Sequence, residues 1–313
     1  MKLSVAALIA TYRRPRELQR LLQSLAQVDG GIDAVIVVDN EGSEEVRALV
    51  EKTYAGAHYL NPGANVGCGG GLKLAEEHAL QMRGAGLTHL LILDDDAVLQ
   101  PGTLTALAGA MERERADLAY PLVTGERGRV GWLPGLAQRI PERGDAFDGT
   151  PEEFRARFGD GPRDFTWAQG ICLLVALGAV ERLGPHRDDF WVRGEDLEFS
   201  LRLTAQGRGI LVPIAAVQHL PPSENTGLSR EAEYLKHCAL LQNIAFIGFR
   251  LPHGRRIAWT LGGALRRFAR LWSWRGFADA CRASWRGAVL GEPAGADSGK
   301  TFRARFTALP PSP

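Results

Sequence analysis

The feature that most constrains this chain is an apolar, strand-like segment that stops at three consecutive aspartates, residues 94–96. Two earlier apolar segments, residues 3–10 and residues 34–38, run in the same way into Thr11 and Asp39. Continuous apolar runs of this length are typical of strands buried in a parallel sheet. Ligands bind beyond the carboxyl ends of such strands, so we expect these polar residues to meet at one site.

Segments with helical periodicity separate the predicted strands. Leu18 and Leu22 share one helix face, and Ser43 can cap the next helix. A glycine-dense loop over residues 67–71 is expected to lead into a further helix over residues 72–82. This alternation predicts an α/β fold with a mainly parallel central sheet covered by helices on both faces.

The predicted α/β domain covers residues 1–230. Within it, residues 125–164 are loop-rich with little periodicity, and we expect them to wrap an edge of the site or to reach toward a second substrate. From residue 231 the apolar spacing is helical, which predicts a C-terminal helical region over residues 231–290. The Gly/Pro/Ser-rich composition of residues 291–313 predicts a disordered tail.

Bulk composition excludes several classes of protein. With 313 residues and 23% charged residues, the chain is of ordinary globular composition, which argues against global disorder. The formal net charge of +1 does not itself decide about nucleic-acid or membrane partners, and we expect no nucleic-acid partner. No apolar segment reaches the roughly 20 residues that a membrane helix needs. No secretory leader follows Met1, and the four cysteines are scattered, which is typical of reduced thiols in a cytoplasmic protein.

The three aspartates carry the strongest chemical signal. Adjacent carboxylates repel one another unless a cation or a positive partner compensates. A hard divalent ion such as Mg²⁺ or Mn²⁺ prefers oxygen ligands and commonly bridges phosphates. A solvated acidic turn is the alternative, but the triplet ends a buried strand, so we predict a metal site at Asp94–Asp96.

Residues 65–71, with the sequence NVGCGGG, precede a predicted helix. Glycine allows the backbone to approach a ligand closely, and a helix N-terminus attracts anions. The segment is neither a Walker loop nor a GxGxxG motif, because Leu72 occupies a required glycine position. A flexible turn is the alternative.

Three other positions are ambiguous by pattern alone. Glu195 and Asp196 open a helix, where a carboxylate can act as a general base or simply oppose the helix dipole. His219 ends an apolar strand and could complete a metal site, although a lone histidine is more often structural. Trp167, near Gly170, could stack on a sugar ring or fill the core.

Seven segments carry a family resemblance, in chain order residues 10–14, 38–40, 65–70, 93–96, 167–172, 190–198 and His219. The ordered set resembles the inverting family-two glycosyltransferases of the GT-A fold, especially the rhamnosyltransferase and galactofuranosyltransferase branch. The resemblance covers about residues 3–250. It implies transfer of a sugar, with galactofuranose or rhamnose favoured, from a UDP- or dTDP-sugar to a hydroxyl of a glycan or lipid-linked acceptor.

The resemblance also implies roles at the matching positions. Asp94 and Asp96 would bind Mn²⁺ or Mg²⁺ together with His219, and Asp196 would be the catalytic base. The residues implied at the acceptor are Trp167, Gly170 and Glu195. The residues implied at the donor are Thr11, Arg13, Asp39, Asn65, Gly67, Gly69, Gly70 and Asp95.

The chain also departs from the family pattern. The galactofuranosyltransferases have paired tryptophans where this chain has Trp167 and Ala168, and their acidic pair usually begins with aspartate rather than Glu195. The large flanking domains of the polymerising members are missing. Addition of one or a few sugars is therefore favoured over polymerisation.

The predicted C-terminal helices carry a strong charge bias. Residues 251–290 contain eight arginines and one acidic residue, with four tryptophans, Trp259, Trp272, Trp274 and Trp285. Such a segment can lie on an anionic membrane surface, which predicts a peripheral position at the inner face of the membrane. The alternative is a helical cap that packs its tryptophans on the catalytic domain or across a homo-oligomer.

Two other functions stay open at this point. A sugar nucleotidyltransferase shares the α/β core, but it is expected to have a glycine- and arginine-rich loop after the first strand, and residues 11–15 contain no glycine. A non-catalytic sugar-nucleotide-binding module would need the donor site without the base.

Overall fold

The structure is a computed structural model that describes residues 3–54, 56–137, 147–220, 230–251, 262, 265 and 278–295. The chain forms two compact units. The sheet unit consists of Met1–Asn65, Gly71–Pro185 and Leu203–Ser223. The helical unit consists of Val66–Gly70, His186–Arg202 and Glu224–Pro313.

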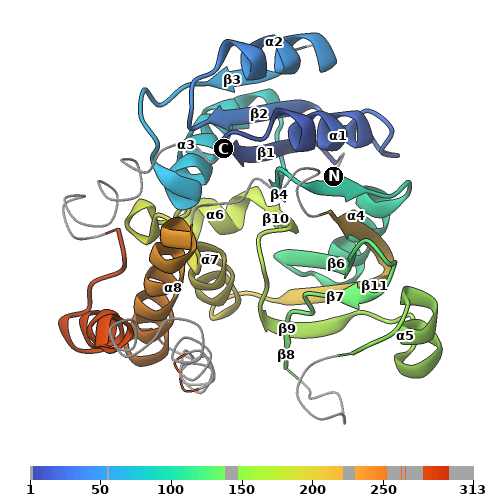
Figure 1. The fold of residues 1–313 in the computed structure, drawn as a ribbon. Helices are drawn as coiled ribbons and strands as arrows, with labels where there is room; N and C mark the ends of the chain where they lie inside the picture. The colour runs from blue at the N-terminus through green and yellow to red at the C-terminus, as the bar shows by residue number, and fades with distance from the viewer. Residues whose placement is uncertain are drawn as a thin grey trace. The chain divides into compact units, whose positions relative to one another are not determined.

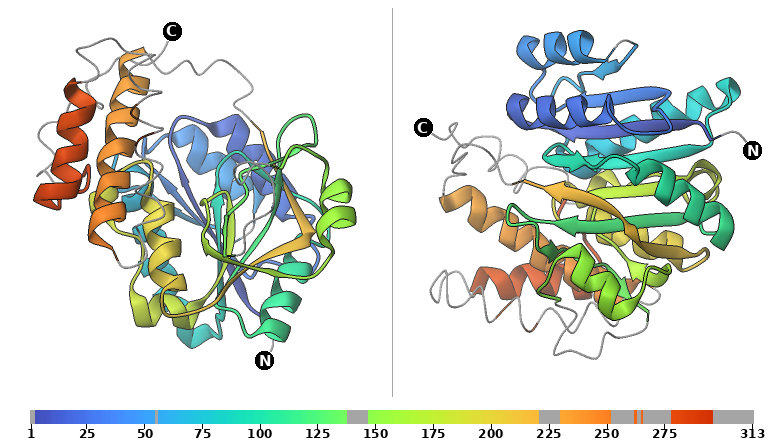
Figure 2. Two further views of the ribbon diagram at one scale, coloured as in Figure 1. Left: turned by 90° about the horizontal axis from the view of Figure 1, so that it is seen from below. Right: turned by 90° about the vertical axis from the view of Figure 1, so that its right-hand side faces the viewer.

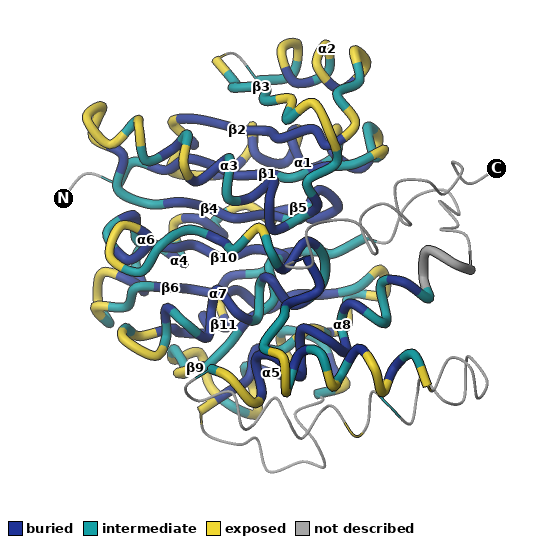
Figure 3. The backbone as a smooth tube through the Cα atoms, turned by 90° about the vertical axis from the view of Figure 1, so that its left-hand side faces the viewer, coloured by how far each residue is buried: buried dark blue, intermediate teal, exposed yellow. Residues whose placement is uncertain are grey.

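One sheet forms the centre of the sheet unit, with the strand order β3-β2-β1-β4-β10-β6-β11-β9-β8 (Figure 1). Its first four strands are parallel neighbours. They are β1 (Val5–Thr11), β2 (Ala34–Asp39), β3 (His58–Leu60) and β4 (His89–Asp94). The first two are buried along almost their whole length, as expected from their continuous apolar sequence (Figure 3).

Strand β10 (Cys172–Ala176) runs antiparallel between β4 and β6 (Leu118–Thr124), and β11 (Gly209–His219) is parallel to β6. The fold class is therefore confirmed, with a sheet that is mixed at β10. Because β10 is antiparallel to both neighbours, β4 and β6 point the same way, and their carboxyl ends lie at one edge. The remaining strands pair antiparallel: β5 (Ala97–Leu99), β7 (Val130–Gly131), β8 (Gly135–Leu136) and β9 (Arg163–Trp167).

Helices flank this sheet (Figure 2). Leu18 and Leu22 are buried, as predicted, and the Ser43 hydroxyl accepts a hydrogen bond from the Val46 N–H at 3.1 Å, which confirms the predicted cap. The helices of this unit are α1 (Pro15–Leu25), α2 (Glu44–Thr53), α4 (Thr103–Glu114), α5 (Pro151–Phe158) and α6 (Leu177–Leu183), with a 3₁₀ turn at Met82–Ala85. Helix α3 (Gly67–Gln81) begins in the helical unit and continues in the sheet unit. The 3₁₀ turn Asp188–Phe190 and most of α7 (Glu195–Thr204) belong to the helical unit.

The helical unit contains α8 (Arg230–Arg250) and a π-helical turn, η3 (Arg286–Leu290). None of the helices in the described part of the chain is both long and apolar enough to cross a membrane. Trp285 is described and its side chain is largely exposed. Trp259, Trp272 and Trp274 lie outside the described residues, so the predicted membrane contact and its alternative, a helical cap, both stay predictions. Residues 296–313 also lie outside the described residues, and the predicted disorder of the tail stays a prediction.

One local prediction was wrong. The glycine-dense segment is not a loop, because α3 already begins at Gly67. The described part of residues 125–164 is loop-rich as predicted, but it also contains α5, which starts with a capping box between Thr150 and Glu153. The Thr-x-x-Glu spacing is the sequence signal that announces this helix.

Gly71 explains why α3 is rich in glycine. A Cβ atom at this position would lie 2.9 Å from the Cβ of Ala10 and 3.3 Å from Nδ2 of Asn40. Helix α3 therefore packs directly against the ends of β1 and β2, where the candidate site begins.

We predict that Gly71→Ala lowers the free energy of unfolding by about 1–3 kcal/mol, because the added methyl group has no space. Gly84→Ala is the matched control, since a Cβ there meets nothing within 4 Å. It should change stability by less than about 0.5 kcal/mol. Urea titration of both variants measures the difference, and equal stabilities would contradict the close packing.

Candidate active site

Strand ends assemble the candidate site, as expected for an α/β sheet. In the sheet unit, Ala10 is in register with Asp94, and Thr11 with Asp39. His219 reaches the aspartates because the end of β11 pairs with β5, which places His219 opposite Ala97.

Asp94, Asp96 and His219 form a cluster that can hold a metal ion. One ligand atom from each, two carboxylate oxygens and one imidazole nitrogen, lie within 4.8 Å of one another. Nε2 of His219 is 2.8 Å from Oδ1 of Asp96. This contact is a hydrogen bond only if Nε2 carries the proton; otherwise two lone pairs face each other, and a cation between them relieves the repulsion. The donor set therefore fits a divalent ion.

Charge in this cluster keeps Asp96 ionised. Burial alone would raise the pKa of Asp96, but the hydrogen bond and charge of His219, with the charge of Arg14, outweigh it and lower the pKa. An ionised carboxylate is the form that binds a metal.

Arg14 and Thr11 hold the middle aspartate. The Thr11 hydroxyl donates to Oδ2 of Asp95 at 2.8 Å, and Nη1 of Arg14 donates to Oδ1 of Asp95 at 2.9 Å and to Oδ2 of Asp96 at 3.1 Å. Burial raises the pKa of Asp95, although these two partners oppose it. Thr11 and Asp95 are thus engaged with each other, and their predicted donor contacts stay predictions.

Sequence reasoning selected Arg13 and missed Arg14. Arg13 has a left-handed backbone, with φ of 59°, and its side chain turns to Glu41, 2.9 Å away. Two adjacent arginines look alike in a sequence. The turn conformation decides which one reaches the carboxylates, and no local sequence pattern encodes it.

Asp39 closes the turn after β2. Its carboxylate accepts hydrogen bonds from the backbone N–H groups of Glu41 and Ser43 and from the Tyr59 hydroxyl. The residue is fully buried. These bonds fix the chain that leads to Asn40, and the predicted contact with the donor base stays a prediction.

Trp167 packs within the sheet unit. It lies on β9 opposite Gly135, where a Cβ atom would come within 2.1 Å of the indole Nε1. Its indole therefore lies against β8. Gly170 and Asn65 belong to the same unit.

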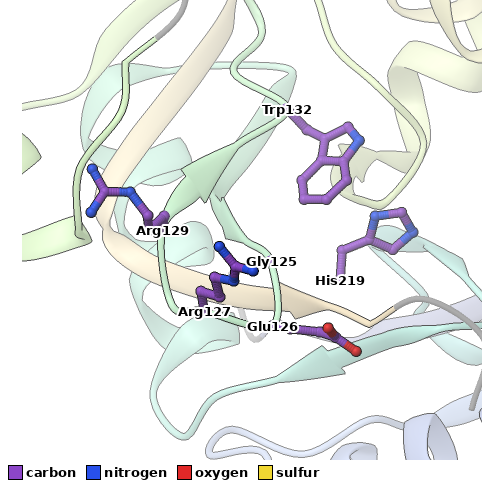
Figure 4. A pocket seen from close by; sticks show the side chains of 6 residues that line it. All are labelled: Gly125, Glu126, Arg127, Arg129, Trp132 and His219. Atoms are coloured by element: carbon purple, nitrogen blue, oxygen red, sulfur yellow. The ribbon is translucent and has the colours of Figure 1, made fainter.

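A pocket of about 370 Å³ adjoins His219 in the sheet unit (Figure 4). The segment after β6, which was expected to wrap the site, supplies the rest of its lining. Trp132 stands edge-on to His219, with 4.7 Å between the ring centroids. Sequence reasoning missed Trp132, because nothing in its neighbourhood distinguishes it from a core tryptophan. The other lining residues are Gly125, Glu126, Arg127 and Arg129.

The predicted glycines of the helical unit contact protein backbone. A Cβ atom at Gly67 would lie 2.2 Å from the carbonyl oxygen of Trp191, and one at Gly69 would lie 2.7 Å from that of Arg187. Gly70 differs, because a Cβ atom there would lie 2.9 Å from the side-chain Cβ of Val66. These contacts give the glycines a packing role within the chain, and the predicted approach to a bound donor stays a prediction.

Glu195 and Asp196 open α7 in the helical unit, directly after a strained turn. Trp191 and Arg193 have φ angles of 38° and 58°, which are costly for residues other than glycine. Asn243 of α8 holds this turn. Its Nδ2 lies within hydrogen-bonding distance of three carbonyl oxygens, those of Phe190, Val192 and Arg193, at 2.7–3.3 Å.

Comparison with known proteins places this arrangement in context. A family model described as "Glycosyl transferase family 2" matches residues 6–163. The chain is 26% identical over 278 residues to an N-acetylglucosaminyl-diphospho-decaprenol L-rhamnosyltransferase of Mycobacterium tuberculosis, covering 82% of this chain and 88% of that protein. It is 36% identical over 124 residues to galactofuranosyltransferase GlfT1 of the same organism, covering 38% of this chain and 40% of that protein.

Solved structures share the fold at low sequence identity. S. aureus TarS in complex with UDP-GlcNAc has a TM-score of 0.60 at 15% identity, covering 91% of this chain and 82% of that one. The mannosyltransferase PcManGT of Pyrobaculum calidifontis, in complex with GDP-Man and Mn²⁺, has a TM-score of 0.54 at 16% identity, covering 98% and 84%.

We predict that Arg14→Met lowers the free energy of unfolding by about 2 kcal/mol or more, because Asp95 stays buried without its cation. The Arg14 side chain is 31% exposed, which limits the loss. Arg13→Met is the matched control, since its exposed pair with Glu41 should contribute less than about 1 kcal/mol. Urea titration compares the two, and an equal loss would show that Arg14 does not compensate the aspartates.

Proposed function

Because this chain belongs to glycosyltransferase family 2, we propose that it transfers a sugar, with inversion, from a nucleotide diphosphate donor to an acceptor hydroxyl in a reaction that depends on a divalent metal. The observation that carries this proposal is the cluster of Asp94, Asp96 and His219 at the strand ends. Carboxylate oxygens suit Mg²⁺ and Mn²⁺ alike, and the imidazole ligand favours a first-row transition ion, so we expect Mn²⁺ to bind more tightly.

The cluster is proposed to stabilise the negative charge of the leaving diphosphate. A divalent cation bound there supplies positive charge to the departing diphosphate. Arg14 holds the carboxylates of Asp95 and Asp96 in place through hydrogen bonds. The Thr11 hydroxyl binds the other carboxylate oxygen of Asp95. This pre-arranged geometry means that little reorganisation is needed when charge develops on the diphosphate.

Asp196 is proposed as the general base. Its carboxylate takes the proton of the acceptor hydroxyl while that oxygen bonds to the anomeric carbon. The bond from that carbon to the diphosphate breaks on the opposite face, and its electron pair leaves with the diphosphate. The Asn243 hydrogen bonds support this role, because they fix the turn from which α7 starts.

The related proteins guide the choice of substrates. A rhamnosyltransferase and a galactofuranosyltransferase among them support rhamnose or galactofuranose as the transferred sugar, and the first supports a lipid-linked sugar diphosphate as the acceptor. A dTDP- or UDP-linked donor is proposed with these sugars. A lipid-linked acceptor also agrees with the proposed peripheral membrane contact through residues 251–290. The predicted donor contacts, at Thr11, Asp39 and the glycines of α3, belong to this proposal.

We predict that UDP or dTDP stabilises the protein only when Mn²⁺ is present. A ligand at 100 times its Kd raises the free energy of unfolding by about 2.7 kcal/mol. Thermal unfolding with UDP, dTDP, GDP and ADP measures this. Asp94→Ala combined with Asp96→Ala should abolish the effect, and Asp160→Ala, an exposed carboxylate, should retain it. Stabilisation of the double variant equal to that of the native protein would exclude the metal site.

We predict that Asp196→Asn retains nucleotide-dependent stabilisation and loses transfer by at least about 100-fold, because an amide cannot accept the proton. Asp188→Asn, an acidic residue of the preceding 3₁₀ turn, is the control and should keep most of the activity. Released UDP or dTDP in the presence of acceptor measures turnover. Full activity of Asp196→Asn would remove Asp196 from the role of base.

A further inference from the structure

Trp132 is held in an unfavourable conformation on the surface of the sheet unit. Its φ of 47° is left-handed, which is rare and costly for a bulky residue. The buried Tyr120 hydroxyl donates a hydrogen bond to the Trp132 carbonyl at 3.3 Å and holds this backbone. The Trp132 side chain is nevertheless 43% exposed, so burial of the indole does not explain the conformation. Strain that brings an aromatic ring to the surface points to a ligand.

The ring lies directly beside the metal cluster. Trp132 and His219 share one wall of the pocket, with their ring planes at 79° (Figure 4). Gly125 leaves space near the outer edge of the six-membered ring of the indole, where even an added Cβ atom would be 3.7 Å from Cζ3. An aromatic face of this kind suits the C–H groups of a sugar ring, which carry partial positive charge.

The loop between β6 and β7 adds two different charged groups. Glu126 and Arg127 line the pocket and are exposed, so they are available to a ligand. The guanidinium of Arg129 is paired with Asp148 at 2.6 Å, which leaves Arg127 as the cation better placed for an incoming anion. A carboxylate accepts hydrogen bonds from sugar hydroxyls, and a guanidinium binds phosphate oxygens in a bidentate manner.

We propose that this pocket binds the acceptor as a sugar phosphate, with the sugar ring on Trp132, its hydroxyls on Glu126 and its phosphate on Arg127. The proposal rests on the proposed transferase function, and it assigns the phosphorylated acceptor to this pocket and to three residues that recognise it. Arg127 is then the residue that selects a phosphorylated acceptor over a neutral glycan.

Sheet order favours the acceptor over the donor as the occupant. The proposed donor contacts Thr11 and Asp39 lie on β1 and β2, on one side of β4. The pocket lies on the other side, at the ends of β6 and β11. Two substrates that react at one cluster must approach it from different sides, so this pocket is left for the acceptor.

Calorimetric titration of the full chain with Mn²⁺ and UDP tests the proposal. The probes are a short-alkyl N-acetylglucosaminyl diphosphate and the phosphate-free N-acetylglucosaminide with the same alkyl chain. We expect the diphosphate to bind native protein more tightly. Trp132→Ala should weaken both probes about tenfold, and Trp132→Phe should retain most of the affinity. Phe249→Ala, which removes an exposed aromatic side chain of α8, should change neither affinity.

Arg127→Ala should weaken the diphosphate probe about tenfold and leave the phosphate-free probe unchanged, because only a charged hydrogen bond is lost. Arg113→Ala, an exposed arginine on α4, is the control. UDP with Mn²⁺ should raise the thermal stability of Trp132→Ala and Arg127→Ala as much as that of the native protein. An unchanged increase also shows that both variants are folded.

Three results would overturn the proposal: no binding of the diphosphate probe to native protein, unchanged probe affinity in Trp132→Ala, or a loss of UDP binding in that variant that exceeds the loss of the probe. Equal losses of both probes in Arg127→Ala would overturn the phosphate assignment. Failure of the transferase function is distinguishable, because native protein would then show no stabilisation by any nucleotide diphosphate.

Discussion

Three carboxylates at the end of one buried strand are the constraint on which the site depends. Asp95 and Asp96 are both buried, and their mutual repulsion must be offset within the fold. Arg14 bridges the two, Thr11 bonds to the first, and His219 contacts the second. Each partner comes from a different strand end or helix start, so the sheet has to be complete before the charges are compensated. Fold and site are therefore coupled through electrostatics.

Strand pairing explains how distant residues meet at this point. The parallel set from β3 to β4 follows from the sequence alternation, and it brings Thr11 and Asp39 to the same edge as Asp94. The approach of His219 depends on a less regular feature. Strand β11 shifts register against β6 between Val212 and Ala216, and its end pairs with β5. A histidine more than 100 positions away thereby becomes a neighbour of the aspartates.

The contrast between regular parallel pairing and the irregular end of β11 also shows how much of the structure the sequence could predict. Periodicity and strand-end polarity predict the parallel strands, the helix cap at Ser43 and a cation site at Asp94–Asp96, because these follow from local burial and repulsion. His219 joined that prediction only through the family resemblance. The choice between Arg13 and Arg14 depends on one left-handed residue, and the helical start at Gly67 depends on packing against other segments. The aromatic residue beside the cluster is Trp132, which the sequence did not single out, and the acceptor role of Trp167 stays a prediction. Tertiary contacts determine the Arg14 contact, the helix start at Gly67 and the position of Trp132, and residue spacing in the sequence predicts none of these.

Backbone strain concentrates where these tertiary contacts act. Five non-glycine residues of the described chain have positive φ angles: Arg13, Arg115, Trp132, Trp191 and Arg193. Arg115 ends α4, where a left-handed residue is an ordinary helix terminus. The other four lie beside the aspartates, in the pocket wall, or in the turn before Asp196. Tyr120 and Asn243 hold two of these segments through backbone carbonyls. Conformations that oppose folding persist only where surrounding contacts hold them, so these segments are fixed by tertiary structure and not by local preference.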